Sequence, residues 1–153
     1  MPTGPVTVPA PWGNGSFGVD WEAVTQYDDF IREAAVPVGW PIERVRAHIM
    51  IESQGAPEPI EQSSSDRLSY GLMQVVPYGV GWEGWQALVK EKAGLPANAP
   101  EQKVRQALME PRINILVGVA ILEMYYVKCG TLDGASSFFF TMTCNWWRDD
   151  PAS

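Results

Sequence analysis

The chain has 153 residues, of which 46% are apolar and 19% are charged, a composition typical of one globular domain with its own core. Its net charge of -7 argues against nucleic-acid binding, because such binding needs Lys and Arg to neutralise phosphates. No run of about 18 apolar residues occurs, so the sequence predicts no membrane span.

The N-terminal segment, residues 1–19, is rich in Pro and Gly and predicts an irregular lead-in to a domain over residues 20–153. It has neither the basic residues nor the apolar stretch of a signal peptide. Three alternatives stay open: the domain acts where it is made, reaches the outside by another route, or is cut from a longer chain. The localisation is therefore left undetermined.

The apolar periodicity predicts a mainly α architecture with about six to seven helices, and no pair of segments has a convincing β period. Asp20 is a candidate N-cap for a helix over residues 20–36, before Pro37. A second helix is expected from Pro41, in its first turn, to Gly55.

Residues 55–69 are rich in Gly, Pro, Ser and Asp, so this segment predicts a loop. The longest helix is expected to begin at Pro111 and to be closed by Gly130. Its apolar face is predicted to hold Ile113, Leu116, Val117, Ala120, Met124 and Val127. Shorter helices are expected over residues 71–76, 83–93, 101–109 and 133–144.

Cys129 and Cys144 lie fifteen residues apart, and the sequence leaves a disulfide and two buried thiols equally open. A disulfide here would contribute on the order of 3 kcal/mol. His48 is the only histidine, and it has no partner at the spacing that zinc sites use, so it is interpreted as an ordinary helix-face residue. We expect neither a metal nor another cofactor.

Glu52 is the candidate catalytic residue, because it extends an apolar stripe on the second helix. At 100° per residue, the stripe occupies a sector of roughly 80°. Burial disfavours a charged carboxylate, so we expect the pKa of Glu52 to be raised and its carboxyl to act as an acid. A structural hydrogen bond at the helix end, or exposure to solvent, is the alternative. The stripe is made of Ile42, Val45, Ile49 and Glu52, and the solvated side holds Glu43, Arg44 and Arg46.

Three segments follow one another in a distinctive order and spacing. They are Ile51-Glu52-Ser53, then Ser65 with Gly71-Leu72-Met73-Gln74 and Pro77, then Pro111 with Asn114-Ile115, Gly118 and Leu122. Together they resemble the motifs of the lytic transglycosylases of glycoside hydrolase family 23. The resemblance implies a lysozyme-like α fold and cleavage of peptidoglycan glycan strands between N-acetylmuramic acid and N-acetylglucosamine.

The resemblance also implies a role for each matching residue. Glu52 would be the general acid and base, and it would form a 1,6-anhydro ring on the muramic acid. For Gln74 and Asn114 a structural role, as a bridging amide and as a helix cap, is the alternative. The substrate-binding residues implied by the match are Ser53, Ser65, Gly71, Met73, Gln74, Val76, Asn114 and Phe140.

A fourth segment departs from the family pattern. Family members carry Tyr-Asn-Ala-Gly at this distance, whereas this chain has Phe140-Thr141-Met142-Thr143. The ring is kept but its hydroxyl, which would reach the catalytic carboxyl, is lost. Elsewhere, Trp82 and Trp85 are candidates either for stacking on sugars or for packing.

Two rival functions stay open. Asp66 or Glu61 would position a water if the chain were a hydrolase similar to goose-type lysozyme. The departure at Phe140 is alternatively what an inactive peptidoglycan-binding or structural module of a phage tail would show. Family members are exported to the envelope or carried in phage tails, so the missing signal peptide favours a phage virion or a larger secretion assembly as partner.

Overall fold

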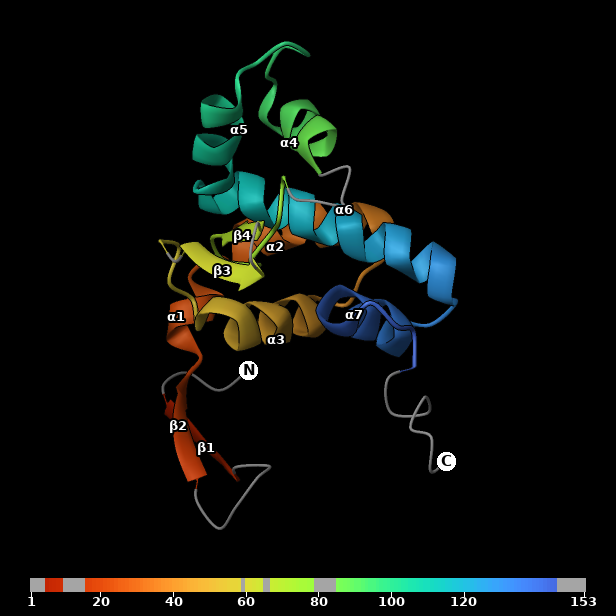
Figure 1. Ribbon diagram of the computed structural model, residues 1–153. Coiled ribbons are helices and arrows are strands. Elements are labelled where there is room, and N and C mark those ends of the chain that lie inside the picture. The colour runs from red at the N-terminus through yellow and green to blue at the C-terminus, as the bar shows by residue number, and fades with distance from the viewer. Residues whose placement is uncertain (1–4, 10–15, 59, 65–66, 79–84, 146–153) are drawn as a thin grey trace.

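The long helix α6 (Pro111–Cys129) crosses the middle of the computed structural model, and other helices pack along it (Figure 1). Helices α2, α4, α5 and α7 all contact it. The structure describes residues 5–9, 16–58, 60–64, 67–78 and 85–145. Within these residues it has seven α-helices, which confirms the mainly α architecture expected from the sequence.

The helices and strands follow in a simple order. The first half holds β1 (Pro5–Pro9), β2 (Ser16–Asp20), α1 (Glu22–Thr25), α2 (Asp28–Ala35), the 3-10 helix η1 (Val36–Val38), α3 (Ile42–Ser53), β3 (Ile60–Ser64) and β4 (Arg67–Tyr70). The second half holds α4 (Gln86–Ala93), α5 (Glu101–Leu108), α6 and α7 (Leu132–Thr141). In Figure 1, α3 and α7 lie on one side of α6, and α4 and α5 lie on the other.

Two antiparallel hairpins occur where the sequence predicts irregular structure. β1 pairs with β2, with Val6 opposite Val19 and Val8 opposite Phe17. β3 pairs with β4, with a register shift between Gln62 and Ser64. The alternation of β-branched and aromatic residues in the first hairpin is short, and the surrounding Pro and Gly residues hide it. The loop prediction for residues 55–69 is wrong at residues 60–64 and 67–69, because polar strands of this length have no hydrophobic period.

The helix boundaries agree with the sequence where a proline or glycine marks them. Pro111 occupies the first turn of α6, and Gly130 follows its last residue in the left-handed conformation with φ 81°. The expected helix over residues 20–36 is instead divided into α1 and α2. At the start of α1, Asp20 Oδ1 accepts a hydrogen bond of 3.0 Å from the Glu22 N–H.

The predicted apolar face of α6 is wrong in its second half. Met124 and Val127 are 50% and 78% exposed, whereas Leu122 and Tyr125 are buried. In this part of the helix the Tyr125 ring is turned inward, where it contacts Phe138 of α7 and Trp85 just before α4. Residues 121–127 contain apolar or aromatic residues next to one another, so the sequence alone does not show which side of the helix is buried.

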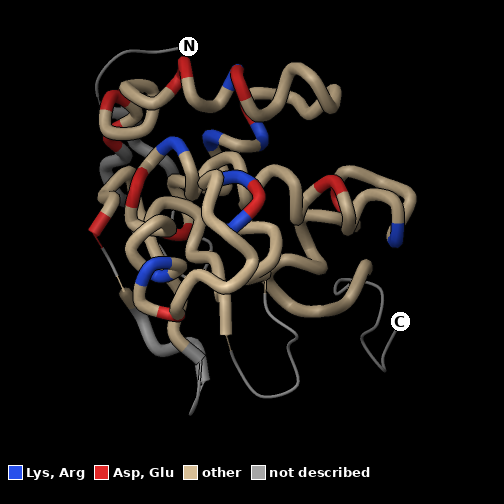
Figure 2. Tube along the Cα trace, turned by 90° about the horizontal axis from the view of Figure 1, so that it is seen from above, with Lys and Arg blue, Asp and Glu red and all other residues tan. Residues whose placement is uncertain are grey.

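Arg46 is also placed differently from expectation, since it lies on the buried side of α3. It is 6% exposed, and its guanidinium donates to both carboxylate oxygens of Asp28 on α2, at 2.9 and 2.5 Å. Further ion pairs join Arg112 to Glu33 and Arg44 to Asp133. Figure 2 shows basic positions on several separate elements, many with acidic positions nearby.

A disulfide joins Cys129, the last residue of α6, to Cys144 beyond α7, with the two Cα atoms 5.5 Å apart. This decides between the two alternatives that the sequence leaves open. The bond closes the α6–α7 hairpin and fixes the segment that follows Thr141.

The Asn114 side chain fastens the turn after β4 to α6 with hydrogen bonds. Its Oδ1 accepts a hydrogen bond of 2.7 Å from the Met73 N–H, and its Nδ2 donates to the carbonyl oxygens of Tyr70 and Leu108 at 2.7 and 2.8 Å. Asn114 is 1% exposed, so its hydrogen bonds to the backbone are shielded from water. The turn is therefore fastened to the central helix.

This fastening explains why residues 71–76 do not form the predicted helix. Gly71 and Gln74 have left-handed backbone conformations, with φ 72° and 52°, which an α-helix excludes. The chain instead turns back, so that Tyr70 and Val75 exchange backbone hydrogen bonds of 2.9 and 3.1 Å. A Cβ at Gly71 would lie 2.5 Å from Asn114 Nδ2, so only glycine fits there.

Replacing Asn114 by alanine is expected to destabilise the fold strongly. The change removes three buried hydrogen bonds to the backbone, and the Tyr70 carbonyl keeps the Val75 N–H as its other partner. We expect the free energy of unfolding to fall by about 3 kcal/mol. Urea denaturation of Asn114→Ala measures the loss, with Asn98→Ala, at an exposed loop position, as the matched control. A loss below about 1 kcal/mol for Asn114→Ala would show that the three bonds do not hold the turn.

Candidate active site

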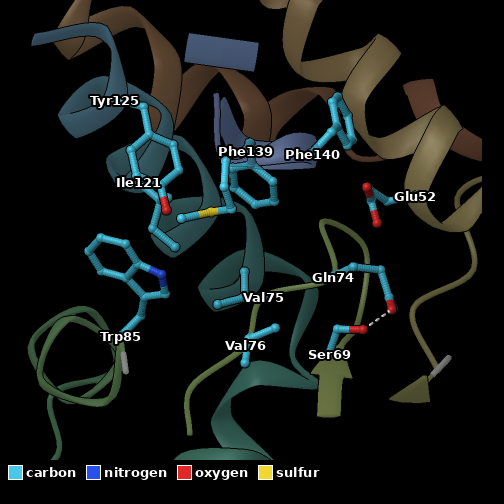
Figure 3. A pocket seen from close by; sticks show the side chains of 11 residues that line it. Glu52, Ser69, Gln74, Val75, Val76, Trp85, Ile121, Tyr125, Phe139 and Phe140 are labelled. Atoms are coloured by element: carbon cyan, nitrogen blue, oxygen red, sulfur yellow. Dashed lines mark hydrogen bonds between the residues drawn. The ribbon is translucent and has the colours of Figure 1, made fainter. Parts of the chain in front are cut away.

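A cavity of about 270 Å³ lies where α3, α6, α7 and the turn after β4 meet (Figure 3). Its described lining combines one carboxyl group, two hydrogen-bonding polar residues and a mostly aromatic and aliphatic wall. The lining residues are Glu52, Ser69, Gln74, Val75, Val76, Trp85, Ile121, Tyr125, Phe139, Phe140 and Met142.

Glu52 enters the cavity from the last turn of α3, and its carboxyl points into it (Figure 3). The apolar stripe expected from the sequence is present, because Val45 and Ile49 are fully buried and Glu52 is half-buried. The helix ends directly after the acid, where Gln54 and Gly55 take the left-handed conformation with φ 55° and 85°. A Cβ at Gly55 would lie 2.4 Å from the Ala23 carbonyl oxygen, so this helix end is packed tightly on α1.

Gln74 reaches the cavity from the turn after β4, and its amide is held at both atoms. Its Oε1 accepts a hydrogen bond of 2.6 Å from the Ser69 hydroxyl, drawn as a dashed line in Figure 3, and its Nε2 donates to the Gly71 carbonyl oxygen at 2.9 Å. Gln74 and Ser69 are 6% and 5% exposed. The amide therefore presents one fixed orientation to the cavity.

Ser69 is a site residue that the sequence analysis does not select. Ser69 lies two positions before Gly71, and nothing in the sequence indicates that it pairs with Gln74. The tight turn brings the two side chains together. Ile121, Tyr125, Phe139 and Met142 are missed as well. Tyr125 lies one helical turn after Ile121, and that spacing is the signal that would have found it.

Several residues that the resemblance assigns to substrate binding lie behind the cavity wall. Asn114 and Gly71 form the fastening described above. Met73 is fully buried and packs on Gly118, where a Cβ would lie 2.4 Å from its Sδ. These residues do not belong to the cavity lining, so the structural interpretation of Asn114 fits this geometry.

Ser53 likewise serves the end of α3. Its hydroxyl donates to the Ile49 carbonyl oxygen at 3.2 Å and accepts from the Gly55 N–H at 3.3 Å. Val76 and Phe140 do line the cavity, as the resemblance implies. Ser65, Asp66 and Trp82 lie outside the described residues, and Glu61 faces Ser69 in the β3–β4 register.

The aromatic wall of the cavity comes mainly from α7. Phe140 lies on the same side as Glu52 in Figure 3 and is 41% exposed. The Trp85 ring packs edge-on against Tyr125, with the ring centroids 6.0 Å apart, so one indole both packs and lines the cavity.

His48 lies one turn before Glu52 on α3 and supports this wall from behind. Its ring stacks on Phe140 at a centroid distance of 4.8 Å and meets Phe139 edge-on at 4.2 Å. The residue is 3% exposed, and neither ring nitrogen has a hydrogen-bond partner among the described residues. Burial lowers the pKa of His48 to about 4, although the nearby Met73 backbone opposes the shift.

This lowered pKa predicts a pH-dependent stability. The unfolded chain takes up a proton on His48 as the pH falls below about 6.5, whereas the folded chain resists it until about 4, so stability is fully present above this window and is lost within it. Between pH 7.5 and pH 5, we expect the free energy of unfolding to fall by about 2 kcal/mol through this residue.

Urea denaturation at the two pH values checks the prediction, with His48→Leu as the variant that removes the titrating group. His48 is the only histidine, and carboxyl groups titrate mostly below this range, so the loss should largely disappear in the variant. An equal loss in both proteins would contradict the assignment.

The remaining chemistry of the described residues is limited. They contain no group of three His, Cys, Asp or Glu side chains placed to hold a metal ion. No single described helix has the length and apolarity to cross a membrane, although α6 and α7, bent by 113°, together satisfy these two criteria.

No protein-family model matches the chain, and a search of curated proteins finds no match either.

Proposed function

We propose that this chain is a peptidoglycan lytic transglycosylase, which cleaves the β-1,4 bond between N-acetylmuramic acid and N-acetylglucosamine. One observation carries the proposal: Glu52, Gln74 and Phe140, from three distant segments, line one cavity. These are the positions to which the sequence resemblance assigns the acid, a glycan contact and the ring beside the acid. A chance resemblance of separate segments would give no reason for them to meet.

In the proposed mechanism, Glu52 donates its proton to the glycosidic oxygen as the bond from that oxygen to C1 of the muramic acid breaks. The acetamido oxygen of the same sugar stabilises the positive charge that develops at C1. The carboxylate of Glu52 then accepts the proton of the C6 hydroxyl while O6 bonds to C1. The product is a 1,6-anhydro sugar, and no water is consumed.

This mechanism requires a single carboxyl group, and Glu52 is the only Asp or Glu among the described lining residues. Hydrolysis by the common two-carboxylate schemes needs a second carboxyl group in the site, whereas substrate-assisted reactions do not. The cavity wall supports the acid form as well, because Val75, Ile121 and Phe139 surround the site with apolar groups that disfavour a charge. The proposed mechanism requires Glu52 to begin the reaction protonated.

The fixed amide of Gln74 gives the glycan a rigid polar contact beside the acid. Since its orientation is set by Ser69 and the Gly71 carbonyl, binding a sugar would not have to order it. The partner proposed for this site is a peptidoglycan strand, and in the proposed context a virion or a secretion assembly carries this chain to it.

Replacing Glu52 by glutamine is expected to abolish lytic activity. Glutamine keeps the shape but cannot transfer the proton, so we expect the rate of clearing of purified peptidoglycan to fall by roughly 100-fold or more. A turbidity assay measures this, with Glu58→Gln as the control at an exposed acid six residues along the chain. Equal clearing by Glu52→Gln and the native chain would exclude Glu52 as the acid.

Mass analysis of the digest separates the proposed reaction from its rivals. Anhydro-muropeptides indicate a transglycosylase, and reducing ends indicate a hydrolase. A native chain that binds sacculi and releases neither product is a binding module, and the proposed reaction would then be wrong.

Replacing Phe140 by tyrosine is expected to raise activity. The new hydroxyl would lie beside Glu52 and donate a charge-assisted hydrogen bond, which predicts a rate increase of about tenfold or more. The initial rate of the turbidity assay is the measurement. Phe138→Tyr is the matched control, because Phe138 is on the same helix but outside the cavity lining. Equal rates for Phe140→Tyr and the native chain would mean that the ring does not reach the carboxyl.

A further inference from the structure

One buried polar side chain next to the cavity takes no part in the proposed reaction, namely His48 on α3. It is 3% exposed, and its two ring nitrogens are the buried side-chain atoms that lack a hydrogen-bond partner among the residues that the structure describes. Buried polar groups are normally paired, so this imidazole needs an explanation. The ring lies one helical turn before Glu52 and therefore borders the candidate active site.

The imidazole packs as an aromatic ring. It stacks on Phe140 with an angle of 22° between the ring planes, and it meets Phe139 edge-on at 84°. Phenylalanine would make similar contacts at this position without leaving polar atoms unpaired. The property that histidine adds is a charge that depends on pH.

The position of the Phe140 ring depends on this contact. Among the described residues, the ring has His48 as its stacked partner and Phe139 as an edge-on partner at 6.1 Å. Helix α7 ends one residue later, at Thr141, so the ring stands in the last turn of a helix. In Figure 3, Phe140 and Glu52 lie on the same side of the cavity. His48 therefore helps to fix where this ring stands relative to the acid.

The charged groups of α3 and α7 give a protonated His48 no counter-charge. Arg44 lies one turn before it on α3 and forms an ion pair of 2.6 Å with Asp133 of α7. Glu52 lies one turn after it, and the proposed reaction requires this carboxyl to be protonated and thus uncharged. The nearest positions along the helix therefore hold a cation and a neutral acid.

The other elements around α3 do not supply a counter-charge either. The Asp28 carboxylate of α2 accepts two hydrogen bonds from Arg46. Burial raises the pKa of Tyr125 on α6 to about 12, so this hydroxyl stays neutral. Residues 71–77, in the turn after β4, include no titratable side chain. The surroundings of His48 therefore favour the neutral ring.

A proton on His48 would act against the proposed reaction in two ways. Burial lowers the pKa of His48 to about 4, so the proton is taken up only in acid. A charged imidazole needs water, which the contact with Phe140 excludes, so this contact must open. The positive charge would also favour the carboxylate form of Glu52 one turn away, and that form cannot donate a proton.

We propose that His48 is a positioning residue that sets the acid limit of the proposed reaction: its neutral ring holds Phe140 beside Glu52, and its protonated ring does not. The inference rests on the proposed function for the reaction itself. A reaction that needs one protonated carboxyl group would gain from a fall in pH, so the carboxyl alone gives it no acid limit. His48 supplies one.

Two substitutions of His48 test whether the site needs a ring at this position. His48→Phe keeps a ring, whereas His48→Leu fills the space without one. At pH 6, we expect the initial rate of peptidoglycan clearing to stay within about twofold of the native rate for His48→Phe and to fall roughly three- to tenfold for His48→Leu. Equal rates for the two variants, both folded by circular dichroism, would overturn the positioning role.

The acid limit is measured by dividing the native rate by the His48→Phe rate at each pH, because the titration of Glu52 itself enters both rates. We expect this ratio to be constant between pH 7 and pH 5.5, to halve at about pH 4 and to reach about a quarter at pH 3.5. A ratio that stays constant to pH 3.5, with both proteins folded by circular dichroism, would overturn the acid limit.

An NMR titration tests the contact between His48 and Phe140 without any cleavage. His48 is the only histidine, so the imidazole signals report a single titration. We expect a midpoint of about pH 4 in the native chain, and a midpoint higher by about one unit or more in Phe140→Ala, which uncovers the ring. Phe138→Ala is the matched control, because its ring contacts Tyr125, and the midpoint should stay in place. A native midpoint near 6.5, or one that Phe140→Ala does not raise, would overturn the proposal.

The two proposals fail in different ways. Glu52-dependent cleavage with a constant rate ratio would support the transglycosylase and reject the role of His48. A Phe140-dependent titration of His48 without cleavage would reject the transglycosylase and support the contact between the two rings.

Discussion

The contact between Asn114 and the turn after β4 is the constraint on which the cavity depends. One buried amide pairs with a backbone N–H and two carbonyls, and it thereby connects α6 to both the β4 turn and the end of α5. Two glycines allow this close approach: Gly71 next to the amide and Gly118 beneath Met73. Without them, the turn would move outward and carry Gln74 away from Glu52.

The same turn has an unfavourable backbone conformation at Gln74, a residue that lines the cavity. Gln74 is a non-glycine residue with φ 52°, which is an unfavourable conformation for a side chain of this kind. Its amide bonds to Ser69 and to the Gly71 carbonyl hold it there. The cavity that results has a polar end with Glu52 and an aromatic end with Trp85 and Tyr125. The glycan of the proposed function would meet polar groups at one end and rings at the other.

Local sequence patterns were sufficient for elements whose ends a proline or glycine marks and whose apolar period is regular. Helix α6, which begins at Pro111 and is followed by the left-handed Gly130, is the clearest case. The apolar stripe of α3 likewise predicts the position of Glu52 at the end of that helix. They failed for the strand pairs and for residues 71–76. Strand pairing depends on partners elsewhere in the chain, and the turn depends on Asn114, some forty residues later.

The identity of the candidate acid was thus available from the sequence, because helical periodicity is a local property that a 3.6-residue repeat reveals. Tertiary structure alone decided what surrounds that acid. It assigned Asn114 to the backbone, paired Ser69 with Gln74, and turned Tyr125 rather than Met124 inward. Each of these outcomes depends on which surface packs against a side chain, and residues that are distant in sequence supply that surface.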